Sequence, residues 1–287
     1  MDMDAGMDTD MQMNTHADVT DRSVVRAAEP GAEARSAPSV LWKAFRVLGV
    51  FSHSRRVLTL AQIVRRSGLP KSTAHRVLAM LLEVGAVEQH SDGYRMGLRM
   101  FSFGALSPEV ALRDAALVHL EELHRVTGQT LHLAILRDGD AVYLEKLRSR
   151  RHDRSPALVG GRLPAHCTAI GKAMLAFSAE RTVADVLAAP LERRTAHSVT
   201  SPAAIRRRLA AIRADGYAVD REEAVDGLAC VAVPVLAGGR PVAAVSVGFA
   251  AAAGSGTVLV DPLRHTAAAI SRSLLAGSAG RLIATGG

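Results

Sequence analysis

The segment from Thr59 to Leu81 constrains the fold of this chain most. Gln62 stands three residues after Thr59, which is the pattern of a capping box at the start of a helix. Gly68 predicts the end of that helix, because glycine accepts the left-handed backbone that follows many helices. A second helical repeat begins after Leu69-Pro70, and the residues that it is predicted to bury are Ala74, Val77, Leu78 and Leu81. Two short helices joined by a glycine-containing turn predict a helix-turn-helix.

The flanking segments extend this motif to a winged helix-turn-helix over residues 38–106. A preceding amphipathic helix is predicted to bury one apolar stripe, formed by Leu41, Ala44, Phe45, Leu48 and Phe51. Residues 86–97 contain two short extended runs around Asp92-Gly93, a dipeptide that favours a two-residue hairpin turn because both positions tolerate positive φ. The alternative is a small helical bundle with a solvated charged face. The order of capping box, turn and hairpin favours the winged motif.

The exposed side of the third helix of this module is polar. Lys71, Ser72 and Thr73 lie at its start and are suited to phosphate contacts, assisted by the free N–H groups of a helix N-terminus. His75 and Arg76 follow one turn later, where an arginine can donate two hydrogen bonds to guanine. The hairpin is expected to place Gln89 and Arg95 along the adjacent backbone or minor groove. The expected partner is double-stranded DNA.

Charge is concentrated in the same module. The chain carries a formal net charge of +7, residues 38–106 hold ten basic and three acidic side chains, and residues 1–37 have a net charge of −5. Residues 1–37 show no helical or strand period and are predicted to form a disordered acidic tail; residues 279–287 are predicted to form a flexible tail. A basic module of this kind favours an anionic partner.

Apolar runs and cysteines bear on the cellular compartment. No apolar run reaches the roughly 18 residues of a membrane span, and residues 1–37 lack the apolar stretch of a signal peptide. The two cysteines, Cys167 and Cys230, cannot form a disulfide framework. A cytoplasmic protein with free thiols and no membrane partner is expected.

The rest of the chain mixes strands and helices. Residues 107–127 predict one amphipathic helix, which is interpreted as a connector between the two domains. Its apolar stripe either packs in the core or meets the same helix of a second subunit. Residues 128–278 predict hairpins around residues 137–140 and 238–239, one helix that starts after Pro164 and another that ends at Gly216. No regular βαβ repeat occurs, so an antiparallel sheet covered by helices is expected and the fold class is α+β.

Three segments of this second part resemble the signature segments of the IclR family of bacterial transcriptional regulators. They are LPAHCTAIGKAMLA (163–176), GYAVDREEAVDGLACVAVPV (216–235) and PVAAVSVG (241–248). The resemblance covers roughly residues 38–278 and includes the winged helix-turn-helix. It implies a repressor or activator that binds palindromic operators as a homodimer or a dimer of dimers. It also implies a GAF-like effector-binding domain that binds a small organic acid, either a carboxylate or an aromatic acid.

The resemblance also implies the residues that contact the effector. They are Ala169, Ile170, Asp220, Cys230, Ser246 and Gly248. Ile170 and Gly248 depart from family members that bind small hydroxy- or keto-acids, and they imply a bulkier or less polar effector. The residues themselves add that a helix starting near Thr168 could hold a carboxylate at its first turn, with Lys172 adding positive charge. Purely structural roles, such as turn capping by Asp220 or core packing by Cys230, are the alternative.

Three other kinds of site were weighed for the C-terminal part. A phosphate-binding P-loop is rejected, because His166 and Ala173 stand where that motif needs glycine and Ser or Thr. His132, His166, Cys167 and Cys230 could gather a zinc ion, but no paired ligand spacing is present. Cys230 with His166 could form a nucleophile and base, but no third orienting group is recognisable. No metal, cofactor or catalytic residue is therefore expected. The alternatives are a thiol-sensing or metal-sensing regulator, or an enzyme domain fused to a DNA-binding module.

Overall fold

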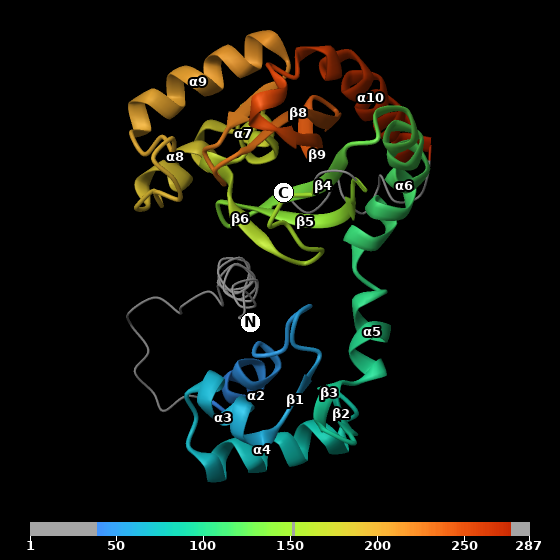
Figure 1. Ribbon diagram of the computed structural model, residues 1–287, viewed down its shortest axis with the longest axis vertical. Helices are drawn as coiled ribbons and strands as arrows, with labels where there is room; N and C mark the ends of the chain where they lie inside the picture. Colours follow the sequence, from blue (N-terminus) through green and yellow to red (C-terminus); the bar gives the residue numbers. More distant parts are fainter. Residues whose placement is uncertain (1–38, 151–152, 277–287) are drawn as a thin grey trace, which may run out of the picture. The chain divides into compact units, whose positions relative to one another are not determined.

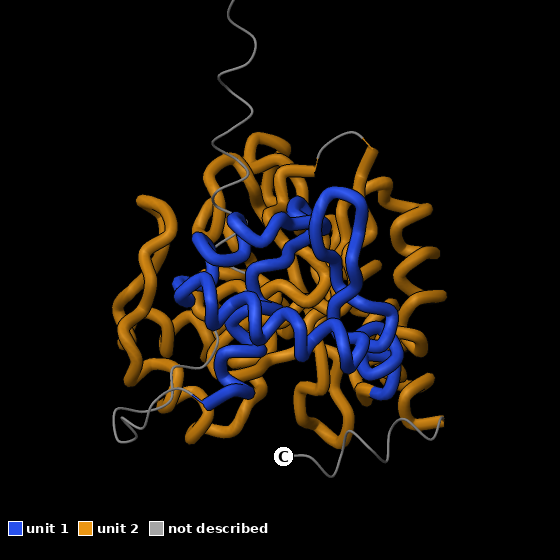
Figure 2. Tube along the Cα trace, turned by 90° about the horizontal axis from the view of Figure 1, so that it is seen from below, with its two compact units in different colours: residues 1–106 blue, residues 107–287 orange. Residues whose placement is uncertain are grey.

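The computed structural model describes residues 39–150 and 153–276. The chain divides into two compact units, residues 1–106 and residues 107–287 (Figure 2). The tails expected at residues 1–37 and 279–287 lie outside the described residues. In the part of the chain that is described, no helix is both long and apolar enough to cross a membrane.

The first unit is a winged helix-turn-helix followed by one more helix (Figure 1). Its elements are α2 (Val40–Leu48), β1 (Val57–Leu58), α3 (Leu60–Ser67), α4 (Lys71–Glu83), β2 (Val87–His90), β3 (Gly93–Met96) and α5 (Leu98–Gly104). The three strands form one sheet in the order β1-β3-β2. A single core joins α2, α3 and α4 to this sheet through buried residues that include Val47, Leu58, Ile63 and Val87.

The helix boundaries of the motif follow from the local sequence, as predicted. Thr59 and Gln62 form both hydrogen bonds of the capping box, and Gly68 ends α3 with a φ of 67°. Helix α4 begins at Lys71, directly after Pro70, and buries Ala74, Val77, Leu78 and Leu81. The helix-turn-helix expected from the sequence is confirmed.

The expected buried stripe of α2 is partly wrong. Val47 and Phe51 are buried, but Leu41 and Phe45 are 69% and 70% exposed. Residues 41 and 45 are one helical turn apart, so they share a side of α2 that differs from the side holding Val47. The helix therefore presents two apolar sides, and only one of them packs on the core of its own unit.

The turn of the wing also differs from the prediction. His90 pairs with Gly93, so the two turn residues are Ser91 and Asp92 and not Asp92-Gly93. Gly93 instead opens β3 with a φ of 147°, and a Cβ atom there would lie 2.4 Å from the Leu58 carbonyl oxygen. Glycine is required at this position by the close approach of β1.

The second unit is built on a six-stranded antiparallel sheet with the order β6-β5-β4-β9-β8-β7. The strands are β4 (Thr130–Arg137), β5 (Asp140–Leu147), β6 (Arg162–Pro164), β7 (Ala218–Arg221), β8 (Leu228–Ala237) and β9 (Arg240–Ala250). The predicted hairpin turns are confirmed at Asp138-Gly139 and Gly238-Gly239, where all four residues have positive φ. This is the backbone that tight two-residue hairpins require.

Helices cover both faces of this sheet (Figure 1). On one face α6 (Pro108–Thr127) and α10 (Val260–Ala276) pack on alternate residues of β4, β8 and β9. On the other face lie α7 (Ala169–Leu175), α8 (Glu180–Ala188) and α9 (Pro202–Asp215). Short 3-10 turns complete the unit at Ala165–Cys167, Ala251–Ala253 and Thr257–Leu259. The antiparallel α+β architecture expected from the sequence is confirmed.

Candidate functional site

The exposed side of α4 carries the polar residues expected to meet DNA. Lys71, Ser72, His75 and Arg76 are exposed and Thr73 is half-buried, while the intervening apolar residues fill the core. The first turn of α4 contains no acidic residue. Its free N–H groups and Lys71 therefore add to one positive surface, which is suited to a phosphate backbone.

The wing presents a second polar surface with an internal ion pair. Gln89 is exposed on β2, and Arg95 on β3 donates from Nε and Nη2 to Oε2 of Glu88 at 3.1 and 2.9 Å. The Leu98 N–H also donates to Glu88, and together with Arg95 it lowers the pKa of this carboxyl group. Exposed pairs of this kind contribute little stability, so Arg95 can exchange Glu88 for a phosphate.

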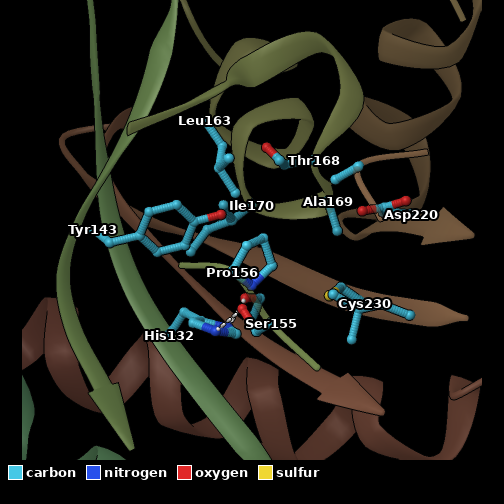
Figure 3. Close-up of a pocket in the computed structure, with 13 residues that line it drawn as sticks. His132, Tyr143, Ser155, Pro156, Leu163, Thr168, Ala169, Ile170, Asp220 and Cys230 are labelled. Carbon is cyan, nitrogen blue, oxygen red and sulfur yellow. Dashed lines mark hydrogen bonds between the residues drawn. The ribbon is translucent and has the colours of Figure 1, made fainter. Parts of the chain in front are cut away.

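The second unit contains a pocket between the α7 face of the sheet and α7 itself (Figure 3). The pocket is small and partly open to solvent. The lining residues are His132, Tyr143, Ser155, Pro156, Leu163, Thr168, Ala169, Ile170, Asp220, Ala224, Leu228, Cys230 and Ser246.

The register of the sheet explains which expected residues meet in this pocket. Asp220 pairs with Cys230 and Cys230 with Gly248, so these three form one row across β7, β8 and β9. Two residues further along β9, in the next row on the same face, Ser246 pairs with His132. Side chains of one row share a face of the sheet, and this face points to α7.

Five of the six residues expected to contact an effector line the pocket: Ala169, Ile170, Asp220, Cys230 and Ser246. Gly248 lies in the same row but has no side chain to contribute. A Cβ atom at Gly248 would lie 3.6 Å from the Cys230 sulfur and 3.7 Å from Cε1 of His132. A Cβ atom at Gly248 would therefore be in ordinary van der Waals contact with two lining residues.

His132 holds two sides of the pocket together. Its Nδ1 lies 3.3 Å from Oγ of Ser246, and its Nε2 lies 2.8 Å from Oγ of Ser155 (Figure 3). Burial lowers the pKa of His132 to about 3, so the imidazole is neutral and one ring nitrogen donates while the other accepts. The ring also packs edge-on against Tyr143, with centroids 5.5 Å apart.

Asp220 is the acidic group of the pocket. It is 2% exposed, and its Oδ1 accepts a hydrogen bond from the Glu223 N–H at 2.8 Å. Burial raises the pKa of Asp220 to about 7, even though the nearby Lys172 acts in the opposite direction. The carboxyl group can therefore gain or lose a proton near neutral pH.

Lys172 acts on Asp220 through its positive charge but does not line the pocket. The side chain is 1% exposed, and its Nζ donates to Oε1 of Glu223 at 2.5 Å and to the Val219 carbonyl oxygen at 2.8 Å. Arg208 lies 3.0 Å from the same Glu223 oxygen. Lys172 thus ties α7 to the segment after β7, and it is not among the lining residues.

The cysteines show no sign of reactivity. Burial raises the pKa of Cys167 to about 12 and that of Cys230 well above its ordinary value. Both remain protonated thiols at neutral pH, which are poor nucleophiles and poor metal ligands. Over residues 39–150 and 153–276, no group of three His, Cys, Asp or Glu side chains is placed to hold a metal ion.

Sequence reasoning missed several lining residues. His132 was considered only as a metal ligand, and Tyr143 was not singled out, although both follow from strand alternation once the β4–β5 register is known. Ser155 and Pro156 lie in an irregular segment between β5 and β6. No periodicity marks that segment, so no sequence signal could place them.

Comparison with known families agrees with the geometry of both units. Residues 40–91 match the family described as IclR helix-turn-helix domain, and residues 105–272 match the family described as bacterial transcriptional regulator IclR C-terminal. The HTH-type transcriptional regulator XynR of Escherichia coli is 35% identical over 197 residues, which is 67% of this chain and 78% of XynR. The transcriptional repressor IclR of the same organism is 30% identical over 218 residues, covering 72% and 78% of the two chains.

Solved structures show the same likeness. The crystal structure of an IclR homolog from Microbacterium hydrocarbonoxydans complexed with 4-hydroxybenzoate has a TM-score of 0.78 and 33% identity, covering 83% of this chain and 100% of that one. The Thermotoga maritima IclR structure has a TM-score of 0.68 and 30% identity, covering 81% and 97%. The relatives are named as transcriptional regulators. With both units matched in order, this chain belongs to the IclR family of bacterial DNA-binding transcriptional regulators.

Proposed function

We propose that this regulator acts in the bacterial cytoplasm and that a small organic acid, bound in the pocket of the second unit, sets its affinity for an operator. One observation carries the proposal: the chain combines an exposed, basic side of α4 in one unit with a small, partly polar pocket in the other. DNA reading and ligand binding are thus assigned to separate surfaces. The protein has no catalytic role in this proposal.

The DNA contacts divide by position on α4 and on the wing. Lys71, Ser72 and Thr73 bind phosphates, while His75 and Arg76 face base edges, because the latter lie one turn further along the helix. Gln89 and Arg95 of the wing follow the adjacent backbone or minor groove. Arginine suits the base-reading position, since it can donate two hydrogen bonds to one guanine.

The effector in this proposal is an aromatic or other small carboxylic acid. The relative from Microbacterium hydrocarbonoxydans was crystallised with 4-hydroxybenzoate. The pocket has the composition that such a compound needs, with apolar walls from Leu163, Ile170 and Leu228. Polar groups from His132, Tyr143, Asp220, Cys230 and Ser246 stand at the same cavity, and they can orient a hydroxyl or carboxyl group.

Homodimerisation and a palindromic operator complete the proposal. The first unit exposes apolar side chains on α2 and α5 that nothing in its own core covers: Leu41, Phe45, Leu98, Phe101 and Phe103. Helix α5 buries none of its residues. A second copy of this chain is the natural partner for exposed apolar side chains of this kind, and two-fold symmetry requires a palindromic site.

Selection of DNA from a random duplex pool tests this function. The wild-type protein should enrich one palindromic sequence, and Arg76→Ala should lose preference at the bases that Arg76 reads. Lys71→Ala is the matched control on the same helix, because removal of a phosphate contact weakens all duplexes alike. Enrichment of the same sequence with the same strength by Arg76→Ala would refute the assignment of α4 as the reading helix.

A further inference from the structure

The pocket offers an acidic ligand no cationic partner. None of the thirteen described residues that line it is a lysine or an arginine. His132, the one basic side chain among them, is neutral because burial lowers its pKa. An anion in this cavity therefore meets only uncharged donors such as the Tyr143 hydroxyl, and it meets the Asp220 carboxyl group.

The cations nearby are already held by acids. Lys172 is paired with the buried Glu223, and Arg208 contacts the same carboxylate. Arg194 donates from Nε to the carbonyl oxygen of the lining residue Ala224 and from Nη1 to Glu192. Lys172, Arg208 and Arg194 are engaged by these contacts, and none of the three is among the lining residues.

Asp220 points into the same cavity as the ligand. Figure 3 shows its side chain beside Ala169, and Cys230 is its register partner on the neighbouring strand. Because Asp220 is one of the residues that line this small pocket, a ligand carboxylate bound there lies close to it. Two negative charges about 6 Å apart at an effective dielectric constant of about 20 weaken binding roughly a hundredfold. One proton removes this repulsion.

On this basis, and resting on the proposed function, we propose that an acid effector binds as its anion together with one proton, and that Asp220 holds this proton in the complex. As the anion enters, the ionised carboxylate of Asp220 takes one proton from solvent and forms an O–H bond. No other covalent bond forms or breaks, and the complex keeps a single negative charge. Two carboxyl groups that share one proton in this way are a recognised arrangement in low-polarity sites.

The groups packed around Asp220 support this assignment. The titratable and charged side chains that act on it or lie in the same cluster are Lys172, His166, Cys167, Tyr143, Arg194, Arg208, Glu223, Cys230 and His132. Burial raises the pKa values of Tyr143 and both cysteines, so these groups stay protonated and carry no charge. Because burial also raises the pKa of Asp220 itself to about 7, Asp220 is the group placed to accept a proton near neutral pH.

Isothermal titration calorimetry of the full-length protein tests the proposal, with 4-hydroxybenzoate and its uncharged amide, 4-hydroxybenzamide, as probes. Each titration is run at pH 6 and pH 8 in buffers of different ionisation enthalpy, which gives the number of protons taken up. For the acid, uptake should approach one proton at pH 8 and be small at pH 6, and affinity should fall about tenfold between the two. Affinity for the amide should change by less than about twofold.

Two variants separate Asp220 from a general charge effect. In Asp220→Asn the affinity for the acid should be the same at pH 6 and pH 8, while the exposed Asp226→Asn should keep the tenfold fall of the wild type. Should Asp220→Asn fail to fold, the proton count of the wild type still decides the question. Binding of the acid without proton uptake would overturn this inference and leave the proposed function standing. Failure of the acid to bind at either pH would instead refute the proposed effector class, and the inference with it.

Discussion

Replacing Lys172 by methionine removes the positive charge of the buried cluster while keeping most of the volume of the side chain. Glu223 is 4% exposed and would lose its contact at 2.5 Å, and the Val219 carbonyl oxygen would lose its donor. Breaking one partner out of a buried ion pair costs about 3–5 kcal/mol. Arg208 remains 3.0 Å from Glu223 with its side chain 46% exposed, so partial compensation places the expected loss near the low end, about 3 kcal/mol.

Differential scanning calorimetry of the full-length protein measures this loss. For a unit of this size, about 3 kcal/mol corresponds to a fall in Tm of roughly 6–12 °C in the transition of the second unit. The chain has a single tryptophan, Trp42, which lies in the first unit. Its fluorescence should follow the first unit alone, and that transition should stay where it is in the wild type.

Two further variants make the test specific. Arg206→Ala, on the same helix as Arg208, breaks an exposed pair with Glu180 at 3.4 Å and should cost at most about 1 kcal/mol. The double variant Lys172→Met with Glu223→Gln should recover part of the loss, because no buried charge is left unpaired. A Lys172→Met protein as stable as Arg206→Ala, or a double variant less stable than Lys172→Met, would refute the buried-pair reasoning.

Three other outcomes are expected. Burial raises the pKa of Asp220 to about 7 from an unfolded value near 3.8. The contribution of Asp220 to the free energy of unfolding should therefore fall by up to about 1.4 kcal/mol per pH unit between about pH 4 and 7, and level off above pH 7. Urea titrations that show the same pH slope for the wild type and Asp220→Asn would contradict this. The double variant Phe45→Ser with Phe101→Ser should weaken self-association, as measured by sedimentation velocity. Its Tm should not fall, since both side chains are at least 70% exposed. An unchanged association constant would count against dimerisation through these side chains. Burial raises the pKa values of Cys167 and Cys230, so both thiols stay protonated and mild peroxide should leave DNA binding unchanged. A reversible loss of binding that is absent from the double Cys→Ser variant would instead favour a thiol sensor.

Local signals in the sequence predicted the helix-turn-helix and the two hairpins of the second unit correctly, and the wing turn to within one residue. A capping box at Thr59, a left-handed glycine at Gly68 and the Gly238-Gly239 turn each act within a few residues, so no tertiary information is needed to read them. The wing turn was misplaced by one residue because Gly93 is required by contact with the Leu58 carbonyl group. That requirement comes from a strand distant in the sequence.

The pocket was predictable only in part for the same reason. Resemblance to the family identified Asp220, Cys230 and Ser246, and strand pairing brings them onto one face. The sequence did not reveal that the ammonium group of Lys172 pairs with Glu223, 51 positions along the chain, and so does not line the pocket. Ser155 and Pro156 line the pocket from an irregular segment, where neither periodicity nor a motif marks them.

The central claim is that one ligand site controls one DNA site. Fluorescence anisotropy tests this coupling directly. A labelled operator, identified by selection from random duplexes, is titrated with the full-length protein in the presence and absence of 4-hydroxybenzoate. Typical coupling free energies of about 1–3 kcal/mol predict a change in operator affinity of roughly 5- to 150-fold. A fragment of residues 38–106 should bind the same DNA more weakly and show no response. A response that persists in the fragment, or full-length protein whose operator affinity is the same with saturating acid, would contradict the account.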